Sequence, residues 1–82
     1  MPKLEERLQD LISLLVDDRE DVFVEEIRLR GGNRRLFEVE VSADDAGKVI
    51  GRQGRTVRAL RSLLALRGQR DGHRYELEVF DT

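Results

Sequence analysis

Hydrophobic residues recur along this chain with two different periods, one typical of helices and one typical of strands. Near the N-terminus the spacing is three or four residues, which predicts an amphipathic helix over residues 3–16. The apolar positions of that helix are Leu4, Leu8, Leu11, Ile12 and Leu15. A run of charged residues, 17–21, then breaks the pattern.

Three later segments alternate apolar and polar side chains, which predicts β-strands over residues 22–30, 36–41 and 75–80. The apolar residues that share a face are Phe23, Ile27 and Leu29 in the first segment, Phe37, Val39 and Val41 in the second, and Tyr75, Leu77 and Val79 in the third. Because Gly31-Gly32-Asn33 is a turn signal, we expect the first two strands to form a hairpin.

Helical spacing returns between the second and third predicted strands. A short helix is predicted over residues 43–50, with Ser42 as its N-cap and Asp45 at the matching third helical position. Gly51 ends this helix, and another is predicted over residues 55–67. The residues expected to be buried are Ala46, Val49 and Ile50 in the short helix and Val57, Leu60 and Leu64 in the long one.

The predicted order αββααβ, with a loop at 68–72, indicates one α+β domain over residues 1–82. Apolar residues make up 39% of the chain, enough for a modest core, and the absence of cysteine excludes disulfides and thiolate metal sites. No apolar run approaches the roughly 18 residues of a membrane span, and the acidic N-terminus is unlike a secretory signal. We therefore expect a cytoplasmic protein that is not attached to a membrane.

The formal net charge of −2 hides an uneven distribution along the chain. Residues 1–26 hold 3 Lys/Arg and 9 Asp/Glu, residues 27–70 hold 11 and 4, and residues 71–82 hold 1 and 4. A basic middle between acidic ends permits a nucleic-acid-binding face, because a polyanion responds to the local field more than to the total charge. A solvated charged surface with no ligand is the alternative interpretation.

Gly51-Arg52-Gln53-Gly54 is the most informative motif, a G-x-x-G loop between two predicted helices. Two glycines three residues apart let the backbone turn sharply and approach another molecule closely. The helix that follows offers free N–H groups and the positive end of its dipole, which suits a phosphate. A tight connection between two helices, without a ligand, is the other interpretation of these four residues.

Basic residues accompany this loop. Lys48 lies about one turn before it, and Arg52 can reach a phosphate as a fork of hydrogen-bond donors. Arg55, Arg58 and Arg61 recur at steps of three and predict a basic stripe along the following helix. Alternatively, Arg58 and Arg61 belong to a solvated face that pairs with acids on the first helix.

The residues around the loop resemble the KH domain. Gly47-Lys48-Val49-Ile50 precedes the G-x-x-G motif, and Arg55-Thr56-Val57-Arg58-Ala59-Leu60 follows it. The order αββααβ is similar to the type II form found in bacteria, and the chain length and early helix resemble the family of small bacterial single-KH proteins called KhpA. The resemblance implies a three-stranded mixed sheet packed against three helices. It also implies binding of single-stranded RNA with a chaperone-like role, and association as a homodimer or with a second KH-containing protein.

KH modules clamp about four nucleotides of single-stranded backbone with this loop. The residues expected to bind RNA are Lys48, Ile50, Gly51, Arg52, Gln53, Gly54, Arg55 and Arg58. The groove for the bases should be apolar, with Ile50, Val57 and either Val39 or Val41 as its floor, although each of these is also a candidate for plain core. Because one module neutralises few phosphates, we expect a dissociation constant in the micromolar range or weaker.

The sequence does not predict catalysis. His73 is the only histidine and lies in a predicted loop, and no Ser or Cys accompanies it in a nucleophile arrangement. Asp44 and Asp45 are expected to be first-turn helix charges, not metal ligands, and we expect no cofactor and no metal.

A protein-interaction module is the alternative function. Ala59, Leu63 and Leu66 lie at i, i+4 and i+7 and give the predicted helix 55–67 a second apolar face. We expect Leu63 and Leu66 to be buried either against another chain or against the first helix of the same chain.

Overall fold

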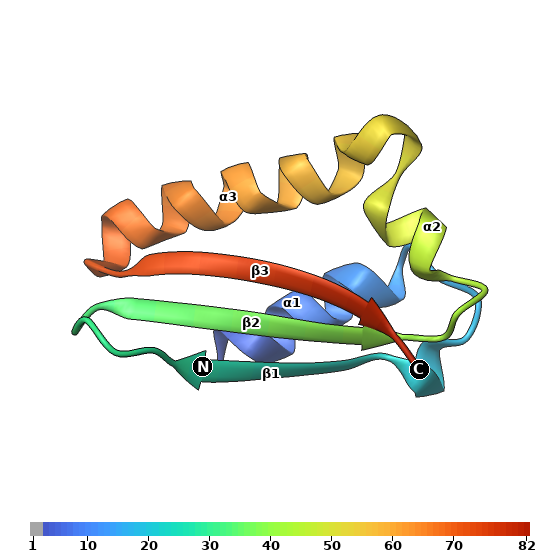
Figure 1. Ribbon diagram of the computed structural model, residues 1–82, viewed down its shortest axis with the longest axis horizontal. Helices are drawn as coiled ribbons and strands as arrows, with labels where there is room; N and C mark the ends of the chain where they lie inside the picture. Colours follow the sequence, from blue (N-terminus) through green and yellow to red (C-terminus); the bar gives the residue numbers. More distant parts are fainter. Residues whose placement is uncertain (1–2) are drawn as a thin grey trace.

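The computed structural model describes residues 3–82 and confirms the predicted order αββααβ (Figure 1). The helices are α1 (Leu4–Ser13), α2 (Ala46–Ile50) and α3 (Arg55–Asp71), and the strands are β1 (Phe23–Arg28), β2 (Arg34–Val41) and β3 (Arg74–Asp81). Single turns of 3₁₀ helix, η1 (Arg19–Asp21) and η2 (Arg52–Gly54), precede β1 and α3. Across residues 3–82, none of the helices combines the length and the apolar character that crossing a membrane requires.

The strands form one three-stranded mixed sheet, as the family resemblance implied. The strand order, which the sequence did not predict, is β1-β2-β3. β1 and β2 form the predicted antiparallel hairpin, whereas β2 and β3 run parallel. A parallel pair needs a long crossover connection, and here α2 and α3 supply it. The G-x-x-G loop lies within that crossover, at the end of the molecule away from the β1–β2 turn (Figure 1).

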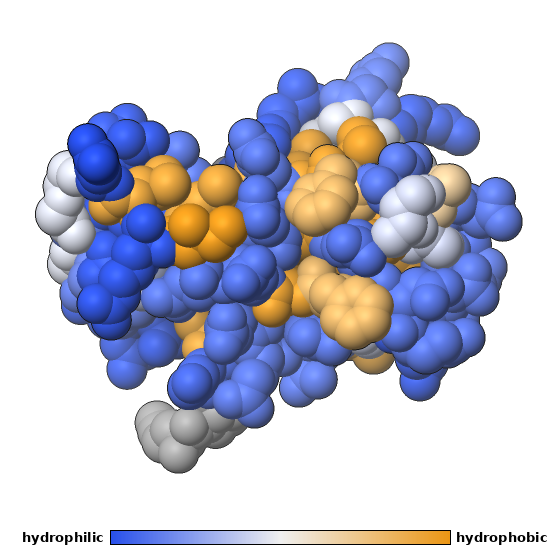
Figure 2. Space-filling view, turned by 60° about the horizontal axis from the view of Figure 1, so that its bottom comes forward, coloured by the Kyte–Doolittle hydropathy of each residue, from blue (hydrophilic) through white to orange (hydrophobic). Residues whose placement is uncertain are grey.

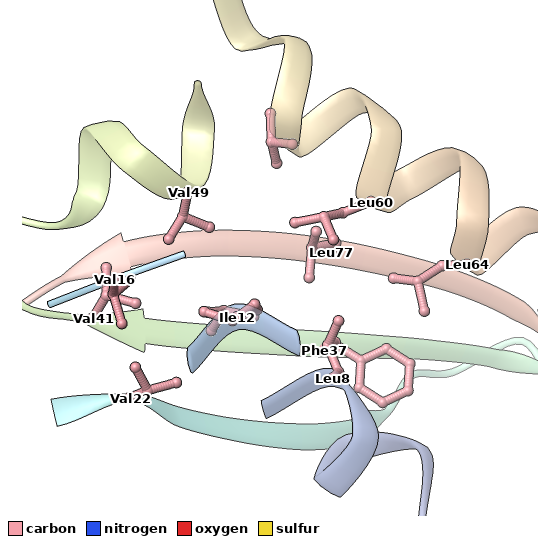
Figure 3. Packing of buried hydrophobic residues seen from close by; sticks show 12 residues of the cluster. Leu8, Ile12, Val16, Val22, Phe37, Val41, Val49, Leu60, Leu64 and Leu77 are labelled. Atoms are coloured by element: carbon pink, nitrogen blue, oxygen red, sulfur yellow. The ribbon is translucent and has the colours of Figure 1, made fainter. Parts of the chain in front are cut away.

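The hydrophobic core lies between one face of the sheet and the helices, with α1 against β1 and α3 against β3. The central strand β2 contributes Phe37, Val39 and Val41, which are fully buried. Figure 3 shows side chains from α1, α2 and α3 pointing toward these strands. The helical members of the core are Leu8 and Ile12 from α1, Val49 from α2, and Val57, Leu60 and Leu64 from α3.

Two hydrophobic residues of β1, one aromatic and one aliphatic, point away from this core. Phe23 and Ile27 share a face as the alternation predicted, but that face is the uncovered one, and the side chain of Phe23 is 58% exposed. The strand register explains which residues of β1 face the core, because Val24 stands opposite the buried Val39 whereas Phe23 stands opposite Glu40. The core receives Val22 and Val24 instead.

The predicted loop over residues 68–72 is wrong, because α3 continues through Gly68 to Asp71. Gly68 is buried, and a Cβ atom added there would lie 2.3 Å from the backbone oxygen of His73. The glycine therefore serves a close approach of the chain that enters β3 and does not break the helix. The break comes at Gly72, whose φ of 73° is the left-handed conformation that commonly ends helices.

We predict that Gly68→Ala destabilises the protein even though alanine is the better helix former. The added methyl group collides with backbone, which cannot turn aside as a side chain can, so we expect a loss of about 1–3 kcal/mol in the free energy of unfolding. Denaturant unfolding measures it. Gln69→Ala, at the exposed neighbouring helical position, is the control and should change stability little. Equal or higher stability of Gly68→Ala would contradict the close-approach explanation.

Candidate nucleic-acid interface

The G-x-x-G loop reverses the chain between α2 and α3 with three residues at positive φ. The φ angles are 80° at Gly51, 57° at Gln53 and 74° at Gly54. Two backbone hydrogen bonds close the loop: Gly51 N–H donates to the carbonyl of Gly47 at 2.8 Å, and Gly54 N–H donates to that of Gly51 at 3.0 Å. Residues 51–54 thus form a specific, closed backbone turn.

The two glycines are required for different reasons. A Cβ atom on Gly51 would lie 2.3 Å from Oγ1 of Thr56, so the first glycine lets the loop pack against the first turn of α3. A Cβ atom on Gly54 would meet nothing within 4 Å, so there only the positive φ favours glycine. The open space beside Gly54 leaves this side of the loop accessible to a ligand backbone.

Two arginines brace the strained residue of the loop. Gln53 is the only non-glycine residue with positive φ among residues 3–82, a conformation that typically costs about 1–3 kcal/mol. Nη2 of Arg58 donates to the backbone oxygen of Gln53 at 2.9 Å, and Nη2 of Arg55 donates to its side-chain Oε1 at 3.2 Å. Arg55 and Arg58 therefore hold the loop's shape and also place positive charge beside it.

Arg52 is the exposed charge of the motif. Its guanidinium makes no hydrogen bond or ion pair to any residue of the described chain, 3–82. It lies just before α3, a helix of 17 residues with no acidic residue in its first turn. The positive end of that helix dipole is therefore not neutralised locally, and Arg52 adds to it.

The basic stripe predicted along α3 is shorter than the spacing of its arginines suggested. Nε and Nη2 of Arg61 donate to the backbone oxygen of Leu77 in β3, at 3.3 Å and 3.1 Å. Arg61 thus ties α3 to the edge of the sheet, and Arg58 turns back to the loop. Neither arginine pairs with an acid of α1, which was the alternative interpretation.

Lys48 is already paired within the protein. Its Nζ donates to carboxylate oxygens of Asp17 and Asp45, and the hydrogen bond to Asp17 is the main reason that the pKa of Lys48 is raised. Two carboxylates face this one ammonium group. Lys48 therefore brings no uncompensated charge to the loop, and its structural contribution is to hold α2 against the segment that follows α1.

Asp45 is buried and precedes α2, so it is not the first-turn helix charge that the sequence predicted. Its side chain is 1% exposed, and its two carboxylate oxygens accept hydrogen bonds from the backbone N–H groups of Asp17 and Asp18 at 3.3 Å and 2.9 Å. The hydroxyl of Ser42, the predicted N-cap, donates to this carboxylate at 3.1 Å. The predicted helix accordingly begins only at Ala46, because residues 43–45 form the turn that brings Asp45 inward.

These bonds lower the pKa of Asp45 to about 2, the N–H of Asp18 acting most strongly and burial opposing it. The sequence contains a signal for this role, since Asp45 has a serine three residues before it, Ser42, and a lysine three residues after it, Lys48. No three His, Cys, Asp or Glu side chains within residues 3–82 are grouped so that they could hold a metal ion.

Of the four apolar residues predicted to form the base-binding groove, one is exposed. Ile50 is 40% exposed, whereas Val57 is 7% exposed and Val39 and Val41 are fully buried. The two strand valines are core, which corrects the prediction that one of them contributes to a base-binding groove. Ile50 is the candidate for contact with a base.

Fold and loop together define the class of protein: the αββααβ order, the mixed three-stranded sheet and a G-x-x-G turn between paired helices are the type II KH arrangement. The model of the family described as KhpA/KhpB, KH domain, matches residues 5–79. This chain therefore belongs to the KhpA/KhpB KH-domain family.

Curated relatives agree with this assignment. The RNA-binding protein KhpA of Streptomyces coelicolor is 50% identical over 95% of each chain. Proteins of the same name from Aquifex aeolicus and Chlamydia trachomatis are 40% and 36% identical, over 90% and 95% of this chain and 96% and 97% of their own. No solved structure was found to match the chain.

We predict that Asp45→Asn removes an acid-sensitive part of the stability. Because the folded pKa of about 2 lies below the unfolded value of about 3.9, the ionised carboxylate stabilises the fold above pH 4, and this contribution is lost as the pH falls toward 2. The asparagine variant should melt at lower temperature than wild type at pH 7, and the difference should shrink between about pH 4 and pH 2. Thermal melts across that range, with Asp44→Asn at the exposed neighbour as control, measure it. A constant difference at all pH values would contradict the assignment.

Proposed function

We propose that this protein binds single-stranded RNA in the cytoplasm, without catalysis, by gripping the sugar–phosphate backbone with residues 51–54. The observation that carries the proposal is the loop itself: a closed turn with three residues at positive φ, open beside Gly54, with the unpaired Arg52 at the positive end of α3. The curated relatives, which are named as RNA-binding proteins, also support the proposal. A short-lived grip of micromolar strength suits a chaperone-like role, in which RNA is held and released.

Each residue near the loop has a role in this proposal. Gly51 and Gly54 allow the backbone conformation, and Arg52 meets a phosphate as a fork of donors. Arg55 and Arg58 keep the turn in shape and add to its field, while Ile50 packs against a base. Lys48, which the sequence also placed among the RNA ligands, positions α2 through its ion pairs with Asp17 and Asp45.

The test is replacement of Arg52 and Gln53 by aspartate. Two carboxylates in the loop would repel phosphate, with coupling of about 1–4 kcal/mol per close pair, so we expect at least a tenfold loss of affinity. The fold should persist, because Arg52 makes no hydrogen bond within residues 3–82 and aspartate tolerates the left-handed conformation of Gln53. Fluorescence anisotropy with a labelled single-stranded RNA measures the affinity.

The matched control is Arg30→Asp with Gln69→Asp, which changes the charge equally at exposed positions near the other end of the molecule. This control should bind RNA nearly as wild type does. In wild type, contact with about three phosphates would make the logarithm of the association constant fall with a slope near −2 against the logarithm of salt concentration. Equal affinities of the loop variant and the control would reject the loop as the binding site.

A second candidate function is association with another protein chain through α1 and α3. Leu63 and Leu66 are 56% and 64% exposed, so the expectation that the first helix of the same chain buries them is wrong. Leu11 and Leu14 of the N-terminal segment are exposed as well, and a groove of about 150 Å³ runs between the helices. These exposed leucines on α1, α3 and the residue after α1, together with the groove, support a homodimer or a heterodimer with a second KH-containing protein.

Leu66→Glu tests the association. We expect the variant to sediment as a monomer where wild type sediments as a dimer, because a carboxylate would be buried at the contact. Its monomer should unfold within about 0.5 kcal/mol of wild type, since Leu66 is exposed in the single chain. Ala65→Glu adds the same charge about 100° around the helix and should leave the dimer intact. Monomeric wild type at all concentrations would eliminate the homodimer.

A further inference from the structure

The face of the sheet turned away from the helices is uncovered, and it has an ordered pattern of side chains. One end holds two exposed aromatic residues, Phe23 and Phe80, which flank Glu40 in one row across the strands. Two rows further along, the half-buried Ile27 and Leu36 stand in line with Glu76. The last row holds Arg34, which pairs with Glu76, and Arg74. Figure 2 shows hydrophobic side chains surfacing in separate groups between hydrophilic ones on the side of the molecule that carries β1.

A row of three carboxylates crosses the middle of this face. The register places Glu25 of β1 beside Glu38 of β2, and Glu38 beside Glu78 of β3. None of the three forms an ion pair with a cation of residues 3–82, and the same holds for Glu40. The central acidic row and the aromatic end share a depression of about 310 Å³, lined in part by Phe23, Glu38 and Phe80.

This arrangement costs the isolated domain stability. Like charges directly opposite each other on adjacent strands are destabilising, and two exposed phenylalanines leave apolar surface in water. Lysine or threonine at any of the three acidic positions would suit an exposed strand better. Local features that oppose stability are the places where a partner is expected to compensate them.

The charge of the face selects the partner. RNA would be repelled by four uncompensated carboxylates. A second copy of this chain, docked face to face about a two-fold axis, would oppose carboxylate with carboxylate. A basic group, by contrast, would pair with the glutamates and relieve their mutual repulsion, while apolar groups on either side would cover the phenylalanines and the aliphatic pair.

We propose that this face binds a basic amphipathic helix of another protein. The aromatic, acidic and aliphatic rows lie two residues apart along the strands, roughly 6.6 Å per step. Residues four apart on a helix are separated by about 6 Å, so a helix with apolar, basic and apolar residues at successive steps of four matches the three rows. Such a helix would complete a third layer, helices on both sides of one sheet, which is a common stable architecture.

A designed peptide tests the proposal directly. We would use a labelled helical peptide with leucine, arginine and leucine about four residues apart, and a second peptide with glutamine in place of each arginine. Anisotropy titrations against the full chain at low salt should show binding of the first peptide and at least about tenfold weaker binding of the second. Glu38→Gln with Glu78→Gln should weaken binding of the arginine peptide by about tenfold.

Asp10→Asn with Glu20→Gln is the matched control, since it removes two exposed negative charges that belong to α1 and η1 and not to a strand. It should leave peptide affinity within about twofold of wild type, and the glutamine variant at Glu38 and Glu78 should keep wild-type RNA affinity. Absence of binding to wild type, or equal weakening in both variants, would overturn the proposal. So would tighter RNA binding without a change in peptide binding, which would make the face only a repellent surface. Loss of self-association in the Glu38 and Glu78 variant would identify a second copy as the occupant and would also overturn it.

Discussion

The place of the G-x-x-G loop depends on one buried carboxylate. Asp45 accepts hydrogen bonds from two backbone N–H groups that lie 28 and 27 residues earlier in the chain, and Lys48 joins the same cluster. The helix α2 has only five residues, far too few to be stable alone. Its orientation therefore comes from this polar anchor at its start and from buried Val49 beneath it. The loop follows directly from the end of α2, so the anchor also fixes where the loop lies against the sheet.

The loop keeps its shape through contacts that come from the helix after it. Thr56 packs where a side chain on Gly51 would have to be, and Arg58 bonds the carbonyl of the left-handed Gln53. Preorganisation of this kind reduces the conformational entropy that binding would otherwise remove. Arg55 and Arg58 thus have two roles in the proposed grip, because their hydrogen bonds to Gln53 hold the turn while their charge favours an approaching phosphate.

Periodicity predicted the helices, the strands and the hairpin, because hydrophobic spacing reports directly on which face of an element is buried. It failed where one segment's conformation is decided by a distant one. Gly68 has the residue type of a helix end, and only the carbonyl of His73 shows that its missing side chain serves packing. In the candidate site, the turn between two helices at residues 51–54 followed from the motif alone. Lys48 and Arg61 were predicted as charges available to a phosphate, but both are hydrogen-bonded within the protein. Sequence spacing could not show this, because their partners, Asp45 and the Leu77 carbonyl, come from outside their own helices.

Two surfaces of this domain gather charges of opposite sign. The arginines around the loop lie on the side of the helices, and the unpaired glutamates line the opposite face of the sheet. At physiological salt the Debye length is about 8 Å, so each surface acts on its own surroundings almost independently of the other. In the two proposed interactions, a polyanion is drawn to the loop and repelled by the sheet face, whereas a cationic segment is drawn to the sheet face and repelled by the loop. The proposed RNA and protein partners would therefore occupy the domain together without competing, and a change of charge on one face should leave the other ligand's affinity nearly unchanged.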